Sequence, residues 1–331
     1  MRATISKNRA QIMGASIVLI YFMHIFIIED ENSVLGIIQR FAFIGVDFFV
    51  ALSMFGLYHS FEKEPVKDVA SYLRYLGKRL LRIYAIFLPI TVIIMLVDNW
   101  SIITFVKRLF LIEQFTVSVY KHLWFIPGIV LFYVYAPFCY MLIKKVKNVP
   151  LLTIAASILV YIILFALHNV IRSDLNAILA RIPDVFIGFM LACYDESLDK
   201  KTKLVYSVSI WVMFILGIAM MVYEVAVGYF NLFHGDNIIH NNLATPGFII
   251  ILAVIFDFFG SHKITKWVNH VAAFLGAITL EIYCTHEWAW KYIGTLDIKE
   301  AKRHIACILI VLTLSLGLHE IGNLIKNKKA G

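Results

Sequence analysis

Ten long apolar stretches constrain the fold of this 331-residue chain more than any other feature of its sequence. A helix that crosses a lipid bilayer needs about 20 predominantly apolar residues, and its backbone polar groups must be satisfied within the segment itself. The sequence therefore predicts an all-α polytopic integral membrane protein, built as a bundle of about ten transmembrane helices. The expected spans are residues 10–28, 41–58, 84–98, 123–143, 150–168, 180–194, 204–224, 245–259, 271–290 and 304–325.

Composition excludes several other classes of protein. Hydrophobic residues make up 61% of the chain and charged residues only 16%, whereas soluble domains contain about 25% charged residues. A cytosolic enzyme, a disordered chain and a secreted disulfide scaffold are therefore excluded. The four cysteines lie in apolar stretches without metal-binding or paired spacing, so neither zinc nor disulfides are expected. Because no loop exceeds about 25 residues, we expect one transmembrane domain over residues 1–331 and no separate soluble domain.

The distribution of Lys and Arg predicts the orientation of the chain. With an even number of spans, both termini lie on one side of the membrane. That side collects 20 of the 30 basic residues, including Lys63, Arg74 and Lys200. Cytoplasmic loops carry an excess of Lys and Arg, so both termini are predicted to be cytoplasmic. The net charge of +8 then reflects topology and attraction to lipid headgroups, and no nucleic-acid partner is expected.

We select seven ionisable side chains inside the expected spans, because each is energetically expensive there and a candidate for function. They are His24, Asp47, Asp184, Asp257, Glu281, His286 and Glu320. At about 1.5 Å per residue, His24 lies about 7 Å and Asp47 about 9 Å below the outer face. A short outer loop joins their spans, so these two side chains can meet. A carboxylate that accepts from one imidazole nitrogen leaves the other nitrogen to act as a general base. A polar pair that only holds two helices together is the alternative.

Further polar side chains reach a similar depth. His286 lies in the last turn of the ninth span, and His122 and Trp124 begin the fourth. This convergence of independent segments predicts a site in the outer half of the membrane. The alternative for His286 is an interfacial histidine, and for Asp257 and Glu320 a contact with lipid headgroups. Metal binding is not expected, because neither paired histidines nor paired cysteines occur at metal-binding spacing.

A basic stripe lies on the opposite, cytoplasmic side. In the segment ASYLRYLGKRLLRIY, Arg74, Lys78 and Arg82 recur at intervals of four residues, with Arg79 adjacent. Side chains four residues apart lie on one face of a helix. Two interpretations stay open. The segment is either an amphipathic helix on anionic lipid or a phosphate clamp, since guanidinium groups make bidentate bonds to phosphate.

Five sequence blocks follow one another along the chain. They are GVDFFVALSMFGL (residues 45–57), KRLLRIYAIFLP (78–89), HLWFIPGIVLFYVYAP (122–137), RIPDVFIGFMLA (181–192) and LGAITLEIYCTHEWAW (275–290). In the same order, they resemble the characteristic blocks of the membrane-bound acyltransferase family 3. The five blocks together cover essentially the whole chain, and ten spans agree with that family's fold.

The resemblance implies a function and roles for individual residues. The family transfers an acyl group, usually acetyl from acetyl-CoA, across the bacterial inner membrane onto hydroxyls of surface or periplasmic glycans. The chain is then expected to be a multi-pass inner-membrane O-acetyltransferase. Its expected partners are the bilayer, acetyl-CoA as acyl donor and a glycan acceptor. The resemblance identifies His24 with the family's histidine, Asp47 with its carboxylate partner, and Arg79 and Arg82 with the coenzyme side.

Three positions depart from the family pattern. Met13 stands where the family usually has an arginine, Met54 where a glycine is usual, and Ala85 where a proline is usual. The arginine nearest to Met13 is Arg9, about one turn lower. Either Arg9 takes over the coenzyme contact, or coenzyme binding depends on the two arginines at the beginning of the third span.

The expected reaction has two open forms. His24 acts either as a general base on the acceptor hydroxyl, which attacks the thioester directly, or as a nucleophile that carries the acyl group. The candidate oxyanion donors are His122, Trp124, Tyr283 and His286. A proton-coupled transporter stays as an alternative class, because buried carboxylates and histidines also form proton relays, although no inverted repeat is visible. A glycan flippase or polymerase is a further alternative, although no large outer loop or inner basic cavity is evident.

Overall fold

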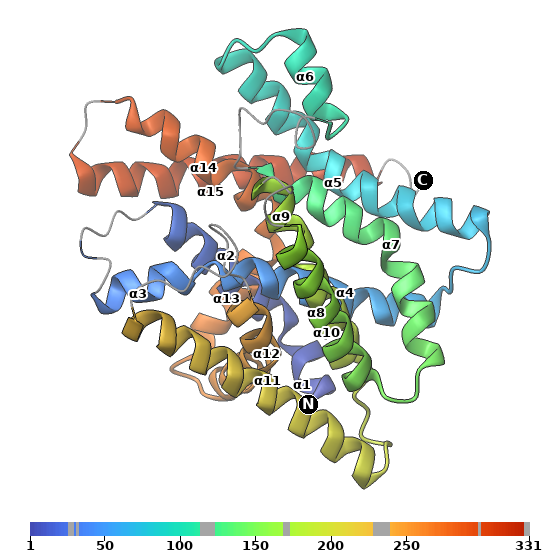
Figure 1. Ribbon diagram of the computed structural model, residues 1–331. Helices are drawn as coiled ribbons and strands as arrows, with labels where there is room; N and C mark the ends of the chain where they lie inside the picture. Colours follow the sequence, from blue (N-terminus) through green and yellow to red (C-terminus); the bar gives the residue numbers. More distant parts are fainter. Residues whose placement is uncertain are drawn as a thin grey trace. The chain divides into compact units, whose positions relative to one another are not determined.

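The computed structural model describes residues 1–25, 30, 33–112, 123–167, 173–227, 239–296 and 299–327. Helices account for 86% of these described residues, which contain no strand. This confirms the all-α class. The helices are α1 (Arg2–Lys7), α2 (Arg9–Ile25), α3 (Val34–Phe41), α4 (Ile44–Lys63), α5 (Val69–Val97), α6 (Ile102–Leu109), α7 (Phe125–Lys145), α8 (Val149–Ala166), α9 (Ser173–Leu179), α10 (Ile182–Cys193), α11 (Lys200–Val227), α12 (Ile239–Ser261), α13 (Lys266–Ala277), α14 (Thr279–Gly294) and α15 (Glu300–Asn327) (Figure 1).

Eight helical segments among the described residues are long and apolar enough to cross a membrane. They are Val34–Lys63, Val69–Val97, Phe125–Lys145, Val149–Ala166, Leu175–Cys193, Lys200–Val227, Ile239–Ser261 and Lys302–Ile325. The count rises to nine if α13 and α14, which bend by 78° at a break, form one span. The first expected span corresponds to α2, a shorter apolar helix of 17 residues. The structure thus confirms a polytopic helical protein with eight or nine candidate spans, where the sequence predicted ten. The cytoplasmic placement of both termini stays a prediction.

The beginning of α5 is fixed by a reciprocal cap. The Asp68 carboxylate accepts from the Ser71 backbone N–H at 2.7 Å, and the Ser71 hydroxyl accepts from the Asp68 N–H at 3.0 Å. These hydrogen bonds hold the pKa of the Asp68 carboxyl below its ordinary value. Because the cap sets where α5 begins, it also sets the helical phase of the basic stripe that follows.

The chain forms two compact units. The first unit comprises residues 1–23, 28–66 and 132–277, and the second unit comprises residues 24–27, 67–131 and 278–331. Each unit brings together segments that lie far apart in the sequence, so the candidate residues are followed unit by unit below. The expected single transmembrane domain over the whole chain stays a prediction.

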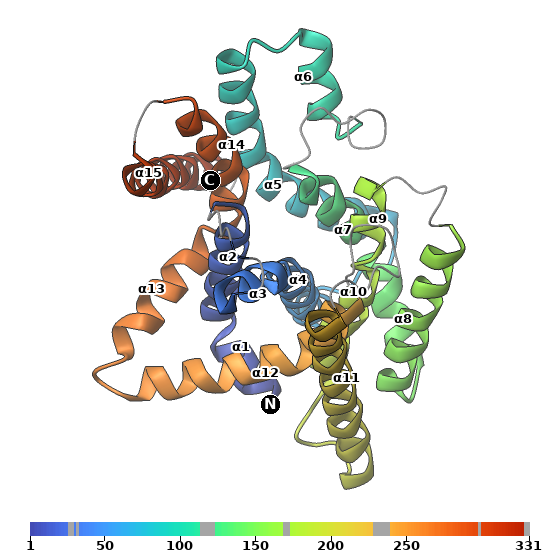
Figure 2. The ribbon, with the colours of Figure 1, turned by 60° about the vertical axis from the view of Figure 1, so that its left-hand side comes forward.

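Helix α4 forms the core of the first unit. Every side chain from Ile44 to Leu52 is buried, and α4 lies against α10 and α12 (Figure 2). Gly188 of α10 makes the contact possible, because a Cβ there would lie 2.1 Å from the Ala51 carbonyl oxygen and 2.8 Å from the Met54 Cβ. The chain therefore accommodates Met54, where the resemblance leads us to expect glycine, by placing a glycine on the opposing helix.

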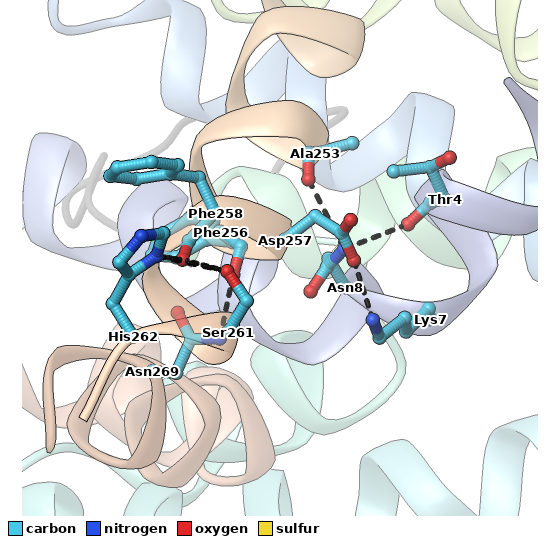
Figure 3. A network of polar contacts seen from close by, with 10 residues as sticks. All are labelled: Thr4, Lys7, Asn8, Ala253, Phe256, Asp257, Phe258, Ser261, His262 and Asn269. Atoms are coloured by element: carbon cyan, nitrogen blue, oxygen red, sulfur yellow. Dashed lines mark hydrogen bonds and ion pairs between the residues drawn. The ribbon is translucent and has the colours of Figure 1, made fainter. Parts of the chain in front are cut away.

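A polar network ties α1 and α13 to α12 within the first unit (Figure 3). The Asn8 amide donates to the Ala253 carbonyl at 3.1 Å, and Lys7 pairs with Asp257 at 2.6 Å. The Asn269 amide donates to a backbone carbonyl near the end of α12 at 2.7 Å. Asp257, for which the sequence left a headgroup contact open, therefore forms an ion pair with α1.

In the second unit, α5 lies against α6, α14 and α15, and α14 and α15 run side by side (Figures 1 and 2). The Thr285 and Ser315 hydroxyls, 3.3 Å apart, link α14 to α15. The beginning of α7 joins this group, because the Phe125 backbone N–H donates to the Tyr283 hydroxyl at 3.1 Å. These contacts assemble the elements that surround the candidate histidines.

Candidate functional site

A pair of histidines lies in the second unit. His286 is in the middle of α14 and is almost fully buried. Its Nδ1 lies 2.9 Å from the Tyr283 carbonyl oxygen and 3.2 Å from that of Ile282. A carbonyl oxygen only accepts hydrogen bonds. These partners therefore assign the proton of the neutral ring to Nδ1 and leave a lone pair on Nε2.

The lone pair of His286 faces His24, the penultimate residue of α2. The His286 Nε2 and His24 Nδ1 atoms are 3.5 Å apart, and the rings meet edge to face with centroids 5.1 Å apart. In this arrangement His24 donates from Nδ1 and carries its own lone pair on Nε2. His24 therefore has the tautomer that a general base needs, and His286 supplies an orienting contact of the kind that the sequence analysis assigned to Asp47.

Glu287 completes a cluster of three ionisable groups. Its Oε2 lies 4.0 Å from His24 Nε2, and ligand atoms of His24, His286 and Glu287 all fall within 4.8 Å of one another. Imidazole and carboxylate groups are common Zn²⁺ ligands. However, His24 presents Nδ1 to His286 and Nε2 to Glu287, so one ion bound to all three would require a ring to turn. The sequence analysis overlooked Glu287, and its expectation of no metal stays a prediction.

Aromatic side chains surround the histidine pair. The Tyr283 ring centroid lies 5.8 Å from that of His286, and the Tyr283 hydroxyl accepts from the Phe125 N–H. Phe125 packs edge-on against Tyr283 and Trp124, with ring centroids 5.4 and 6.0 Å away. The structure thus brings three of the four candidate oxyanion donors into one cluster. The fourth, His122, lies outside the described residues.

Asp47 lies in the first unit, fully buried on α4. The Asn242 amide donates to Asp47 Oδ1 at 3.0 Å and to Asp184 Oδ2 at 2.7 Å. Arg181 Nε is 3.6 Å from Asp47 Oδ1, and the Tyr161 hydroxyl donates to the Asn242 carbonyl oxygen at 2.8 Å. Asp47 thus belongs to a buried polar cluster, and its expected contact with the histidine of the first span stays a prediction.

This buried cluster holds two carboxyl groups but one guanidinium. Asp47, Asp184 and Arg181 are all 0% exposed. Two ionised carboxylates beside one guanidinium would leave an uncompensated charge in the interior, which is energetically expensive, so we expect the pair to hold one proton and the cluster to be neutral. The sequence analysis overlooked Arg181 as a member of this cluster. The available signal was its position one helical turn before Asp184.

Helix α5 carries the basic stripe in the second unit. Arg74 and Arg82 are exposed, whereas Arg79 is half-buried and lies one helical turn from the buried residues Tyr75 and Ile83. The Arg79 guanidinium carbon lies 5.8 Å from the centroid of the Tyr75 ring. The fold therefore brings both candidate coenzyme arginines into the unit that contains the histidine pair, and it distinguishes Arg79 from the exposed members of the stripe.

Arg9 contacts α4 in the first unit. Its Nε donates to the Leu52 carbonyl oxygen at 3.0 Å. Its guanidinium occupies the space beside Gly56, where a Cβ would lie 2.7 Å from Arg9 Cζ. Arg9 therefore joins α2 to α4, and a coenzyme contact for Arg9 stays a prediction.

A second imidazole–carboxylate pair links α14 to α15. His319 Nδ1 lies 2.9 Å from Glu281 Oε1, with the Glu281 side chain buried and that of His319 partly exposed. A carboxylate only accepts, so His319 donates from Nδ1. The sequence analysis selected Glu281 and overlooked His319, because the pair is visible only once α14 and α15 lie side by side.

The fold and the site together define a helical membrane protein with an oriented histidine as its candidate base. The comparison with protein families agrees with this description. A family model described as an acyltransferase domain, that of acyltransferase family 3, matches residues 14–318. The chain belongs to this family and is a membrane acyltransferase, as the resemblance implied. No curated protein and no solved structure gives a significant match.

Proposed function

We propose that the protein is an O-acyltransferase of the bacterial inner membrane that moves acetyl from cytoplasmic acetyl-CoA to a hydroxyl of a cell-surface or periplasmic glycan. The observation that most supports this proposal is the tautomer of His24, fixed by His286, in a chain of the acyltransferase family. A base with a defined lone pair is what the activation of a hydroxyl requires.

We favour direct transfer, in which His24 acts as the base. The acceptor hydroxyl gives its proton to His24 Nε2 as its oxygen attacks the thioester carbonyl carbon. The carbon–sulfur bond then breaks, and the imidazolium returns the proton to the leaving thiolate, so coenzyme A departs as the thiol. His286 accepts from His24 Nδ1, while its own proton is held by the Tyr283 carbonyl. Trp124 and Tyr283 are the described candidates for donors to the developing oxyanion.

The acyl donor is proposed to bind through its phosphates at Arg79 and Arg82. Both lie on α5, in the unit that contains the histidine pair. Guanidinium groups form bidentate, charge-assisted hydrogen bonds with phosphate oxygens. Arg79 is half-buried and so has the more defined position, whereas Arg9 donates to the backbone of α4.

Radiolabelled acetyl-CoA tests the proposal. Membranes that contain the wild-type protein should transfer the label as an ester into a glycan fraction. His24→Ala should reduce this transfer by about 10²-fold or more at equal abundance, the usual contribution of a general base. His286→Ala should retain more activity, since it removes the orienting partner and leaves the base in place.

His319→Ala is the matched control, because His319 belongs to the same unit but pairs with the Glu281 carboxylate. This variant should transfer label at close to the wild-type rate. Wild-type membranes that label no acceptor would contradict the proposed function. A His24→Ala protein that keeps more than about a tenth of the turnover would contradict the assignment of the base.

A further inference from the structure

Glu287 faces the same nitrogen that the proposed reaction uses as its base. Its side chain is 35% exposed, and its Oε2 lies 4.0 Å from His24 Nε2. That separation is longer than the 3.5 Å contact between the two histidine rings and too long for a direct hydrogen bond. The two groups are therefore neighbours that do not bond to each other.

Both of these groups are acceptors. His24 donates from Nδ1 to His286, which leaves its lone pair on Nε2, and an ionised Glu287 has no proton to donate. A ligand that contacts both groups therefore has to donate twice over a distance of 4.0 Å. Two hydroxyl groups on adjacent carbons of one sugar ring provide two such donors.

The next turn of α14 adds an aromatic side chain with a cation beside it. Trp290 lies one turn beyond His286 on the same helix face, and its ring stacks on that of His304 with centroids 4.9 Å apart. The Arg303 guanidinium carbon lies 5.9 Å from the centroid of the Trp290 ring. Ligand sites commonly combine aromatic walls with a few polar groups that fix the orientation of the ligand. The histidine pair and Glu287 are thus followed by an aromatic ring and a cation.

We propose that Glu287 selects the acceptor by accepting a hydrogen bond from the hydroxyl next to the one that His24 deprotonates. The acceptor class is then a vicinal diol, as in a sugar ring with two neighbouring unmodified hydroxyls. Glu287 accepts this hydrogen bond without exchanging a proton with the substrate. Its proposed role is therefore in the choice of acceptor, and proton transfer is left to His24. The inference rests on the proposed function, because it assumes that His24 activates a hydroxyl.

Two small alcohols that differ by one hydroxyl test the inference. Full-length protein in lipid nanodiscs is supplied with radiolabelled acetyl-CoA and with either 1,2-cyclohexanediol or cyclohexanol at subsaturating concentration. The wild-type protein should acetylate the diol about ten- to hundredfold faster, the usual effect of one hydrogen bond to a charged group. Glu287→Leu should bring this ratio close to one by slowing the diol reaction. Glu287→Gln retains a neutral acceptor and should retain part of the preference.

Glu281→Gln is the control, because Glu281 is a carboxylate of the same helix that bonds to His319. Its diol preference should equal that of the wild type. Since the ratio is measured within each variant, differences in folded protein cancel.

Three results would overturn the inference while the proposed function stands, provided that the wild type labels its glycan fraction. They are a wild-type ratio near one, no reaction with either alcohol, and an unchanged ratio in Glu287→Leu. Activity that EDTA abolishes and Zn²⁺ restores in the wild type would also overturn it, by assigning Glu287 to a metal. A wild-type protein that labels neither glycan nor alcohol overturns the proposed function and the inference with it.

Discussion

The protonation of the buried ionisable residues follows from the donors and acceptors around them. In the second unit, the Tyr283 carbonyl fixes the proton of His286, and His286 in turn fixes that of His24. In the first unit, Arg181 pairs with Asp47 and compensates one charge, so we expect the buried Asp184 carboxyl beside it to be protonated. The first arrangement favours the tautomer of a base, whereas the second neutralises a charge inside the protein.

Asp184→Asn should therefore be tolerated better than Asp47→Asn. An asparagine resembles a protonated carboxyl, and the ion pair with Arg181 is made by Asp47. A buried charge that loses its partner costs about 3–5 kcal/mol. We expect Asp184→Asn to keep near-normal membrane abundance and Asp47→Asn to lose much of it, measured by quantitative immunoblotting and thermal unfolding in detergent.

Neutralising the partner provides the control for this charge argument. Adding Arg181→Gln to Asp47→Asn should recover part of the lost abundance, because no unpaired charge then remains. Abundance, measured apart from turnover, separates this role from one in which Asp47 orients the catalytic base. Equal losses in Asp47→Asn and Asp184→Asn would contradict the assignment of the proton to Asp184.

At the scale of the helix, substitutions on α5 distinguish attraction to lipid headgroups from the binding of phosphate. A lipid-facing cation contributes about 1 kcal/mol whether it is Lys or Arg, whereas a phosphate clamp loses its bidentate fork when Arg becomes Lys. We expect Arg79→Lys and Arg82→Lys to weaken acetyl-CoA binding several-fold in detergent, where no anionic bilayer is present. Arg74→Lys, at the exposed beginning of the stripe, should have little effect. Unchanged affinity in both of the first two variants would assign the stripe to lipid headgroups.

Two glycine substitutions should have opposite effects, one at the contact between α4 and α10 and the other on α5. A Cβ at Gly188 would lie 2.1 Å from the Ala51 carbonyl oxygen, a backbone atom, whereas Gly77 on α5 has nothing within 4 Å. Gly188→Ala should cost about 1–3 kcal/mol through overpacking. Gly77→Ala should be neutral or stabilising by up to about 1 kcal/mol, since alanine favours a helix. Thermal unfolding in detergent measures both, and a Gly188→Ala protein as stable as the wild type would contradict the close approach.

The helices were more predictable from the sequence than the partners of their side chains. Each of the ten expected spans overlaps a helix of the structure, because the length of an apolar run is a local property. The partner of His24 is not local. The sequence favoured Asp47 on the following span, whereas the structure places His24 beside His286, 262 residues away. Apolar run length does not determine which helices meet in a bundle, and a family motif identifies a histidine without identifying what orients it.

At the scale of the whole molecule, the candidate residues divide between the two units. The second unit contains His24, Arg79, Arg82, Trp124, Tyr283 and His286, whereas the first contains Arg9 and Asp47. The base, its orienting partner and the candidate phosphate ligands therefore lie in one unit. Substitutions in the first unit should act mainly on folding and abundance, and substitutions at the second-unit site mainly on turnover and donor affinity.

The number of membrane crossings decides whether the two termini lie on the same side of the membrane. Eight or ten crossings put both ends of the chain on one side, whereas nine put them on opposite sides. The described helices give eight crossings, nine if α13 and α14 form one span, and ten if the 17-residue α2 crosses as well. For ten crossings, the excess of basic residues on one side predicts that both ends lie in the cytoplasm.

Cysteine labelling in intact cells measures this topology. Lys67 lies in the exposed segment before α5, and Lys299 in the exposed connection between α14 and α15. A membrane-impermeant maleimide should label Lys299→Cys in intact cells and Lys67→Cys only after the cells are opened. The wild-type protein, with its four native cysteines, gives the background. Tags on both ends should likewise become accessible only after opening. If the tag on one end alone is accessible from outside, the number of crossings is odd. In that case either α2, which carries His24 near its end, or the bent pair of α13 and α14 does not cross the membrane. If it is α2, the depth expected for His24 is wrong.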